Sequence, residues 1–416
     1  MWGNVMASKV IYLNKNETTP LIFEGDSHLP IVSIQIAFKN SGSIVDGDKP
    51  GLAKLTAKIM GEGTEDLGST AFAELLESKA IHISAHTGVE TFVLELSALK
   101  SEFDAAMDAF EMLLKDPNFT SKTLDKVKTT TIGALLQKEN DFDYVASKEL
   151  KALLFEGTVL AHPSSGTVES VKDIDIDDVE EFYKNHVVQA NAIGIFGGDI
   201  TQEDAEKAYK RILELLPVGK SEAVRTVNVR KKPLEKVIKK DTQQAYVYFG
   251  SPFHISVDSP DYYKARVAMY VLGTGGFGTR LMEEIRVKRG LAYSAYSRMA
   301  ISKSHSYLSG QLQTKVESGD EALALVKSEF DRFVKKGVTQ KELSAAKEFL
   351  LGSEPLRTET LSQRLSRTFM AFYKGLDLDN DTKELKRIEK LTLVDLNHFI
   401  KSHPEILELS VVTVTK

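Results

Sequence analysis

Arg286 and Tyr293 are the residues of this 416-residue chain whose types and spacing suggest chemistry most directly. A guanidinium and a phenol both donate hydrogen bonds. Gly290, which lies between them, is the residue type that commonly ends a helix. With the arginine at a helix end and the tyrosine on the following strand, the two groups can converge on one acceptor. The alternative is an ordinary surface arginine and a half-buried tyrosine.

An internal repeat indicates that the scaffold does not require this pair. Two pairs of segments align without a gap: residues 50–64 with 260–274, and residues 74–86 with 284–296. In the first half, the positions of Arg286 and Tyr293 are taken by Leu76 and Ile83. The same helix-to-strand unit therefore forms there with apolar residues, and the arginine and tyrosine are additions to it.

His82, His86 and Glu90 could be mistaken for a metal site, because histidines four residues apart share one face of a helix. Residues 81–86, however, alternate apolar and polar side chains as a strand does. At roughly 3.3 Å per residue, histidines four apart on a strand lie about 13 Å from each other. One zinc ion cannot bridge that distance, so we expect structural or solvent-facing roles for these residues.

A glycine-rich segment at residues 272–280 is the other local motif. It lacks the Gly-Lys-Ser/Thr ending and the preceding strand of a phosphate-binding loop, so it is not a nucleotide site. It is either a flexible connection between two helices or a loop whose backbone approaches or gates a peptide. In the second case Gly275, Gly276 and Gly278 are the candidate substrate-binding residues.

The elements that must position these residues are both strands and helices. Strand-like patterns occur at residues 31–38, 91–96, 245–249 and 306–312, and helix-like periods at 101–114 and 319–334. This order predicts an α+β fold with two duplicated, structurally similar α/β halves, each a sheet with helices packed on one face. Prolines and a glycine mark a linker at 216–233. The predicted domains are therefore residues 1–220 and 235–416.

Composition excludes several classes of function. The chain has 53 Lys and Arg against 59 Asp and Glu, a net charge of -6, and no Cys, which rules out disulfides, thiolate nucleophiles and Cys-ligated metals. A mildly acidic chain without a long basic run is not expected to bind nucleic acid. No stretch approaches the roughly 18 apolar residues of a membrane span, and the N-terminus has no signal-like apolar stretch. We expect a soluble, cytoplasmic protein, with the periplasm as the alternative.

Four blocks of the sequence resemble the zinc peptidases of the pitrilysin, insulin-degrading enzyme and mitochondrial processing peptidase group. These blocks are residues 51–64, 162–167, 191–200 and 279–297. The last block, which contains Arg286 and Tyr293, is the most specific. This group is built from duplicated α/β halves. The resemblance therefore implies the same fold that the strand and helix patterns predict.

The first of these blocks departs from the group's inverted zinc motif, His-x-x-Glu-His. In that motif two histidines one helical turn apart bind zinc, and the glutamate is the general base for the attacking water. Lys54, Ala57 and Lys58 stand at these positions, and the downstream glutamate ligand falls on Gly133 or Ala134. A protonated lysine has no lone pair to offer a metal ion. The resemblance therefore implies that this chain has no zinc site.

The second half, by contrast, matches the group. Active relatives use an arginine and a tyrosine seven residues apart to hold the substrate carbonyl as negative charge develops on it, and Arg286 and Tyr293 occupy these positions. The resemblance implies a subunit that binds peptide and supplies this pair to a zinc-bearing homologous partner, with zinc expected in the partner. We expect the chain to be inactive alone and to act as part of a heterodimeric peptidase. A homodimer is the other assembly.

Two further interpretations stay open. The chain could be a non-enzymatic scaffold or peptide-binding protein of the same fold, like the core subunits of the respiratory cytochrome bc1 complex. It could also be an active peptidase with an unrecognised metal site, which needs ligands that the sequence does not show. Lys54 and Lys58 either form a solvated helix face or pair with acidic residues.

Overall fold

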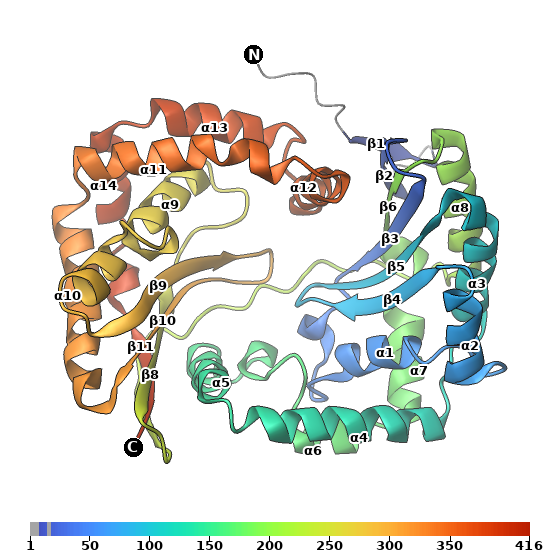
Figure 1. Ribbon diagram of the computed structural model, residues 1–416, viewed down its shortest axis with the longest axis horizontal. Helices are drawn as coiled ribbons and strands as arrows, with labels where there is room; N and C mark the ends of the chain where they lie inside the picture. Colours follow the sequence, from blue (N-terminus) through green and yellow to red (C-terminus); the bar gives the residue numbers. More distant parts are fainter. Residues whose placement is uncertain (1–7, 15–17) are drawn as a thin grey trace. The chain divides into compact units, whose positions relative to one another are not determined.

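The computed structural model describes residues 8–14 and 18–416, which form two compact units (Figure 1). Unit 1 consists of residues 1–136, 163–225 and 357–370, and unit 2 of residues 137–162, 226–356 and 371–416. Each unit thus takes one segment from the opposite half of the sequence. The predicted domains, 1–220 and 235–416, follow the two copies of the repeat. They do not include this exchange of segments between the two halves of the sequence.

Unit 1 is built on a six-stranded sheet. Its strands are β1 (Lys9–Tyr12), β2 (Pro20–Gly25), β3 (Ile31–Lys39), β4 (His82–Thr87), β5 (Thr91–Leu99) and β6 (Ala192–Gly198). Their order is β1-β2-β6-β3-β5-β4. Only the β2 and β6 pair is parallel. The edges of the sheet are therefore β1 and β4.

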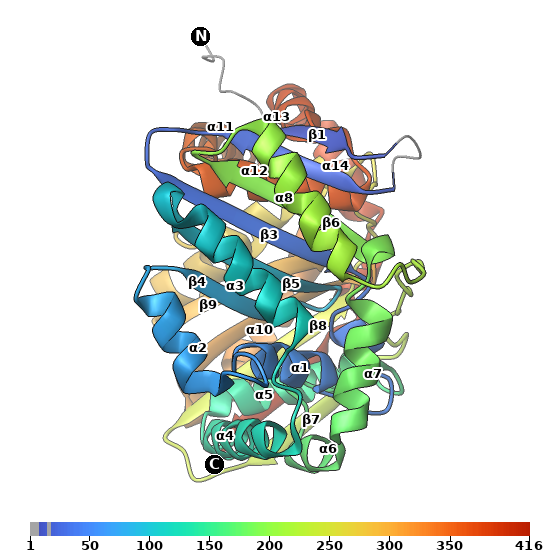
Figure 2. The same ribbon diagram turned by 90° about the vertical axis from the view of Figure 1, so that its right-hand side faces the viewer.

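Helices cover one face of this sheet, and Figure 2 shows α3 and α8 crossing its strands. The helices of unit 1 are α1 (Leu52–Met60), α2 (Gly68–Glu77), α3 (Phe103–Lys115), α4 (Ser121–Lys138), α6 (Val168–Asp173), α7 (Ile176–His186) and α8 (Gln202–Leu215). Side chains alternate between the two faces of a strand, so Val32, Ile34 and Ile36 are buried under the helices. Ser33 and Gln35 of the same strand lie on the opposite face.

Unit 2 repeats this plan with a five-stranded sheet of order β7-β11-β8-β10-β9. The strands are β7 (Glu235–Lys239), β8 (Gln244–Pro252), β9 (Ala292–Ile301), β10 (Ser306–Lys315) and β11 (Ser410–Thr415). Its helices are α5 (Phe142–Leu154), α9 (Tyr262–Met269), α10 (Gly319–Lys336), α11 (Gln340–Gly352), α13 (Asn380–Lys390), α14 (Leu393–Lys401) and the end of α12 (Leu361–Lys374). The predicted fold of two similar α/β halves is confirmed.

Short turns complete the list of elements. The 3-10 turns are Ser43–Val45, Lys100–Glu102, Val159–Ala161, Gln189–Asn191, Val316–Ser318, Glu354–Arg357 and Pro404–Leu407, and the π-helical turns are Tyr270–Thr274 and Met282–Val287. Among the helices of the described residues, none has the length and apolar composition needed to cross a bilayer.

Helix α5 lies on the second face of the sheet of unit 2, beside β8 and β11 (Figure 1). Phe249 of β8 packs against Phe330 of α10 with ring centroids 5.7 Å apart, which places α10 on the first face. The next residue, Gly250, faces the other way, and a Cβ there would lie 2.8 Å from Leu154 of α5. Glycine at this position therefore allows α5 to approach the sheet closely.

The start of α12 lies on the second face of the sheet of unit 1 in the same manner. Phe196 of β6 faces the helices and packs against Tyr209 of α8, with ring centroids 5.8 Å apart. The next residue, Gly197, faces α12, and a Cβ there would lie 2.6 Å from Leu365. The sequence predicts helices on one face of each sheet. In the structure each sheet also has one helix on its other face, and that helix comes from the opposite half of the sequence.

A buried ion pair holds α12 in this position. Arg364 donates hydrogen bonds to Glu24 at 2.6 Å and to Asp26 at 3.1 Å. Glu24 is only 4% exposed. A carboxylate removed from water needs such charge-assisted partners, because its desolvation is costly. Arg364 therefore neutralises the buried charge of Glu24, which would otherwise have no cationic partner.

We expect Arg364→Ala to lower the free energy of unfolding of unit 1 by about 3 kcal/mol, because it leaves the Glu24 carboxylate buried without its cation. Urea denaturation followed by circular dichroism measures this. The matched control is Lys100→Ala, which breaks an ion pair to Asp199 whose lysine is 57% exposed and should cost less than about 1 kcal/mol. Equal losses in the two variants would contradict a buried, stabilising role for Arg364.

Candidate functional site

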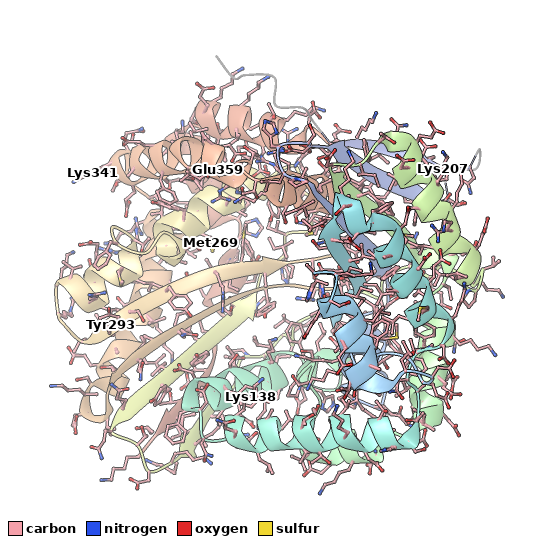
Figure 3. The ribbon with its side chains drawn as sticks, turned by 45° about the vertical axis from the view of Figure 1, so that its right-hand side comes forward. Lys138, Lys207, Met269, Tyr293, Lys341 and Glu359 are labelled. Carbon is pink, nitrogen blue, oxygen red and sulfur yellow. The ribbon has the colours of Figure 1, made fainter. Side chains whose placement is uncertain are left out.

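Arg286 and Tyr293 lie together at the start of β9 in unit 2, and Figure 3 shows Tyr293 on this strand. Arg286 is near the end of the π-helical turn Met282–Val287, and Tyr293 is the second residue of β9. Gly290 separates them with a φ of 63°, the left-handed conformation that ends a helix. π-helical turns are rare and occur frequently at functional sites.

The guanidinium of Arg286 lies against two aromatic rings. Its Cζ atom is 4.5 Å from the ring centroid of Tyr293 and 4.7 Å from that of Phe277. Both distances are within the range of cation–π attraction. Tyr293 is 80% exposed and Phe277 65% exposed, so the cation is held by rings that are themselves open to solvent. The predicted pair is therefore brought together through the face of the tyrosine ring.

The cations near Arg286 are engaged with one buried carboxylate. Glu284 accepts from Lys288 at 2.5 Å and from Arg289 at 2.8 Å, and Arg332 lies 3.5 Å away. Hydrogen bonds from Lys288 and Arg289 lower the pKa of Glu284 to about 2. For Arg286, in contrast, the side chain makes no hydrogen bond or ion pair with any residue that the structure describes. Its N–H groups can therefore serve an acceptor from another molecule.

The glycine-rich segment places Phe277 over Arg286. At Gly275 a Cβ would lie 2.6 Å from the ring of Tyr270, so a close approach requires glycine there. Gly276 and Gly278 have φ values of 72° and 86°, which other residues adopt with strain. The segment joins two π-helical turns, as a connection between helices would. Whether its backbone contacts a peptide stays a prediction.

Phe277 is a site residue that the sequence analysis missed. It is a large apolar residue between Gly276 and Gly278, in a loop where polar residues are usual. That context is the signal that could have identified it. Its contact with Arg286 depends on the fold of the loop, which periodicity does not reveal.

Helix α1 carries Lys54, Ala57 and Lys58, the positions where the resemblance predicts the remains of a zinc motif. Ala57 is buried at 3% exposure, Lys54 donates to Ser165 at 3.2 Å, and Lys58 donates to Thr131 at 2.7 Å. Each lysine thus has a hydroxyl partner within unit 1. Two ammonium groups and a methyl group do not form a zinc site, so the donors present do not fit the metal.

Lys58 also links α1 to the region where the resemblance predicts the position of the third zinc ligand. Its partner Thr131 lies on α4, just before Gly133 and Ala134, which are both exposed. Neither residue offers a side-chain ligand. Across residues 8–14 and 18–416, no cluster of three or more His, Asp or Glu side chains is placed to hold a metal ion.

The histidines of β4 follow the strand pattern. His82 and His86 both lie in the strand His82–Thr87, as the alternation predicted, and His86 lies 3.9 Å from Glu95 of β5. Glu90 is buried in the turn that joins these strands. The three residues are not gathered around one point.

Asp46 fixes the start of α1. Its carboxylate accepts hydrogen bonds from the backbone N–H groups of Gly51 at 2.8 Å and Ala53 at 2.9 Å. Gly51 has a φ of 101°, so glycine is required at this turn. Burial raises the pKa of Asp46 to about 7, although these two hydrogen bonds lower it in part.

We expect the stability of unit 1 to fall as the pH rises from about 4 to 7. In that window the folded state keeps a proton on Asp46 that the unfolded state, with a pKa of 3.8, has released. Urea denaturation across this range should show a loss of the order of 1–3 kcal/mol that Asp46→Asn removes. Asp48→Asn, at an exposed neighbouring position, is the control and should retain the slope. If Asp46→Asn left the pH dependence of the free energy of unfolding unchanged, a group other than Asp46 would be its cause.

We expect Phe277→Leu to remove one of the two cation–π contacts of Arg286. An exposed contact of this kind contributes about 0.5–1 kcal/mol of interaction free energy. The Nε–H resonance of Arg286, shifted by the ring currents in the native protein, should move toward its free value in the variant. Phe277→Tyr, which keeps the ring, should restore the native shift. If Phe277→Leu left the resonance in place, the stack would not exist in solution.

Two family models match the sequence. Residues 24–167 match the model described as insulinase, peptidase family M16, and residues 173–350 match the model described as the peptidase M16 inactive domain. A Helicobacter pylori protein named non-peptidase homolog YmxG is 44% identical over 412 residues, which cover 99% of this chain and 95% of that protein. A Bacillus subtilis protein named uncharacterized zinc protease YmxG is 23% identical, with 76% of each chain covered.

Solved structures share the fold. The crystal structure of a peptidase M16 inactive domain from Pseudomonas fluorescens has a TM-score of 0.89 at 25% identity and covers 98% of each chain. A chain of complex III2 from Candida albicans has a TM-score of 0.77 at 16% identity, covering 98% of this chain and 96% of its own. At that identity the likeness shows the fold alone.

Proposed function

The chain belongs to peptidase family M16, and we propose that it is a member without its own zinc site that binds peptide and supplies Arg286 and Tyr293 to a zinc-bearing partner. The observation that carries this proposal is an asymmetry between the two halves. At the degenerate motif, Lys54 and Lys58 are bound to hydroxyl groups of the same unit. In the second half, Arg286 lies between two exposed rings without a carboxylate partner in the described chain.

Arg286 has the properties of a group that stabilises developing negative charge. Its guanidinium is always protonated and offers several N–H donors in a fixed plane. The stack between Phe277 and Tyr293 restricts the side chain before a substrate arrives, which reduces the entropy lost on binding. A preorganised donor aimed at a carbonyl oxygen is worth about 3 kcal/mol in the transition state. Zinc in the partner would supply the attacking water.

Peptide binding to an edge strand fits the two sheets. β4 in unit 1 and β9 in unit 2 each pair on one side only, so each exposes main-chain groups on the other. An extended peptide can add to such an edge through main-chain hydrogen bonds. Tyr293 lies on β9 itself, so a peptide along this edge would pass beside the Arg286 stack.

A second candidate is a non-enzymatic scaffold or binding protein. The name of the Helicobacter pylori relative, a non-peptidase homolog, supports a chain that does not hydrolyse peptides by itself. The shared fold of the complex III2 chain is compatible with a role in assembly. Neither role needs the Arg286 stack, which is the reason that we place this function second.

The test is peptidase activity on a mixed peptide library, with zinc content, for the chain alone and after mixing with a zinc-motif homologue from the same genome. We expect activity only in the mixture. Arg286→Ala should lower kcat about 100-fold, and Tyr293→Phe about 10-fold, because each removes a donor to the carbonyl oxygen. Lys54→Ala in this chain is the control and should change kcat less than twofold.

Other results would reject parts of the proposal. Unchanged activity of the Arg286→Ala mixture would remove the catalytic role and leave the scaffold function. Activity of the chain alone, together with one bound zinc per chain, would show that a metal site exists.

A further inference from the structure

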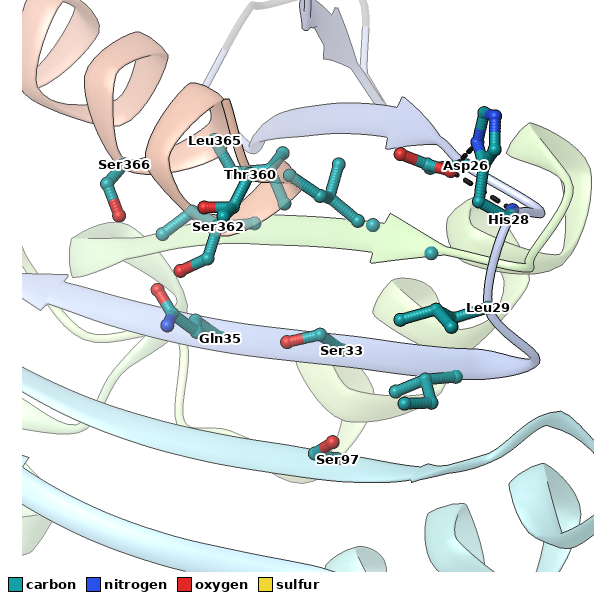
Figure 4. A pocket seen from close by; sticks show the side chains of 15 residues that line it. Asp26, His28, Leu29, Ser33, Gln35, Ser97, Thr360, Ser362, Leu365 and Ser366 are labelled. Carbon is teal, nitrogen blue, oxygen red and sulfur yellow. Dashed lines mark hydrogen bonds and ion pairs between the residues drawn. The ribbon is translucent and has the colours of Figure 1, made fainter. Parts of the chain in front are cut away.

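The helix on the second face of each sheet carries a cation. In unit 1 this helix is α12, whose Arg364 is paired with Glu24 and Asp26. Asp26 lines a cavity of about 470 Å³ between the start of α12 and the sheet (Figure 4). The lining of the cavity includes Ser33, Ser97, Ser362 and Ser366. The cation of α12 is therefore neutralised by carboxylates of its own unit.

In unit 2 the helix on the second face is α5, and its cation is Lys151. The backbone N–H of Phe155 donates to the carbonyl of Lys151 at 3.0 Å, so the helical turn extends to Phe155. The ring of Phe155 packs edge-on against Tyr307 of β10, with ring centroids 5.2 Å apart. Residues four apart lie on the same side of a helix. Lys151 is therefore on the side of α5 that faces β10.

The strand register places Arg298 of β9 on the same face of this sheet. Gly250 of β8, against which Leu154 of α5 lies, is paired with Ser309 of β10. Ser309 is in turn paired with Arg298. Paired residues share one face of a sheet, and neighbouring strands are about 4.8 Å apart, so the backbone of Arg298 lies about 10 Å from that of Gly250. The long side chains of a lysine and an arginine can meet over such a distance.

The charges of Lys151 and Arg298 act on each other. Protein atoms that displace water from its ammonium group lower the pKa of Lys151, and the positive charge of Arg298 lowers it further. The guanidinium of Arg298 lies 5.8 Å from the ring centroid of Tyr296. Neither cation has a hydrogen bond or an ion pair with any residue that the structure describes. Two neighbouring cations repel each other, and an anion between them removes this cost.

The carboxylates on α5 and directly after it do not neutralise Lys151. Each is held by another partner: Asp143 by Tyr248, Glu149 by Lys236 and Glu156 by Arg230. Asp143 also lies eight residues before Lys151, which is about 12 Å along the helix axis. Within α5, all of which is described, no acid is therefore available to Lys151.

Three hydroxyl groups lie on the same face as the two cations. Ser309 is the direct neighbour of Arg298 in the sheet, Tyr296 precedes Arg298 by two residues, and Tyr307 precedes Ser309 by two. Tyr307 is only 9% exposed. Among the described residues, none provides a hydrogen-bond partner to any of these three hydroxyls. Burial raises the pKa of Tyr296 and Tyr307, so both phenols keep the proton that they can donate.

We propose that Lys151, Arg298 and Ser309 bind the phosphate group of a small molecule. A phosphate group carries about 1.5 to 2 negative charges at pH 7, which match two cations, and its oxygens accept hydrogen bonds from cations and hydroxyls alike. A carboxylate brings one charge and leaves half of the positive charge unmatched. Arg298 lies five residues beyond Tyr293, about 16 Å along β9, so this site is distinct from the Arg286 pair.

The test is NMR of the full chain, labelled at arginine Nε and at the tyrosine rings, titrated with inorganic phosphate at constant ionic strength. We expect saturable shifts of the Arg298 Nε–H and of the Tyr296 and Tyr307 rings. The ring of Tyr209, which is buried in unit 1, should not shift. Lys151→Gln and Arg298→Gln should each weaken binding about tenfold, because each removes a charge-assisted hydrogen bond.

Lys148→Gln is the matched control, since it removes the same charge from the same helix. Lys148 is paired with Glu139 at 2.5 Å, so its loss should change the affinity less than about twofold. Arg286→Ala should also bind phosphate as the native chain does, which separates this test from that of the proposed function.

Glycerol phosphate distinguishes the two sources of the phosphate group. Binding at least as tight as that of inorganic phosphate assigns the site to a phosphate ester, and weaker saturable binding assigns it to the free ion. Three results would each overturn the proposal: shifts that do not saturate with phosphate, equal shifts caused by acetate at the same ionic strength, or native affinity in Lys151→Gln.

Discussion

The exchange of two helices between the halves of the chain is the constraint on which the rest of the structure depends. Each sheet has one face buried by the helices of its own repeat, and the second face receives a helix from the other repeat. Gly250 and Gly197 make both approaches possible, since a Cβ at either position would collide with a leucine of the exchanged helix. Neither half can therefore complete its unit alone.

The exchange also determines where charge is buried. Glu24 lies on β2 of the first half, and its cation, Arg364, comes from the second half. An unpaired buried carboxylate is costly, so the two halves are linked by electrostatics as well as by apolar packing. The same segment of α12 lines the cavity that Ser33 and Ser97 line from the sheet.

Duplication lets one scaffold carry different chemistry in its two copies. The helix-to-strand unit that ends with Arg286 and Tyr293 in unit 2 has Leu76 and Ile83 at the matching positions of unit 1. There Leu76 is buried in the core. On α1, Lys54 and Lys58 donate hydrogen bonds to hydroxyl groups of the same unit.

The sequence by itself determined the fold class, the repeat and the strand that contains His82 and His86. These features depend on residue type and local periodicity, which a single chain displays directly. Only the tertiary structure decided that α5 and α12 change units, that Phe277 covers Arg286, that Asp46 is buried, and that four serine hydroxyls surround one cavity. Each of these depends on contacts between residues far apart in the chain, or on the path of a loop whose conformation glycine leaves open.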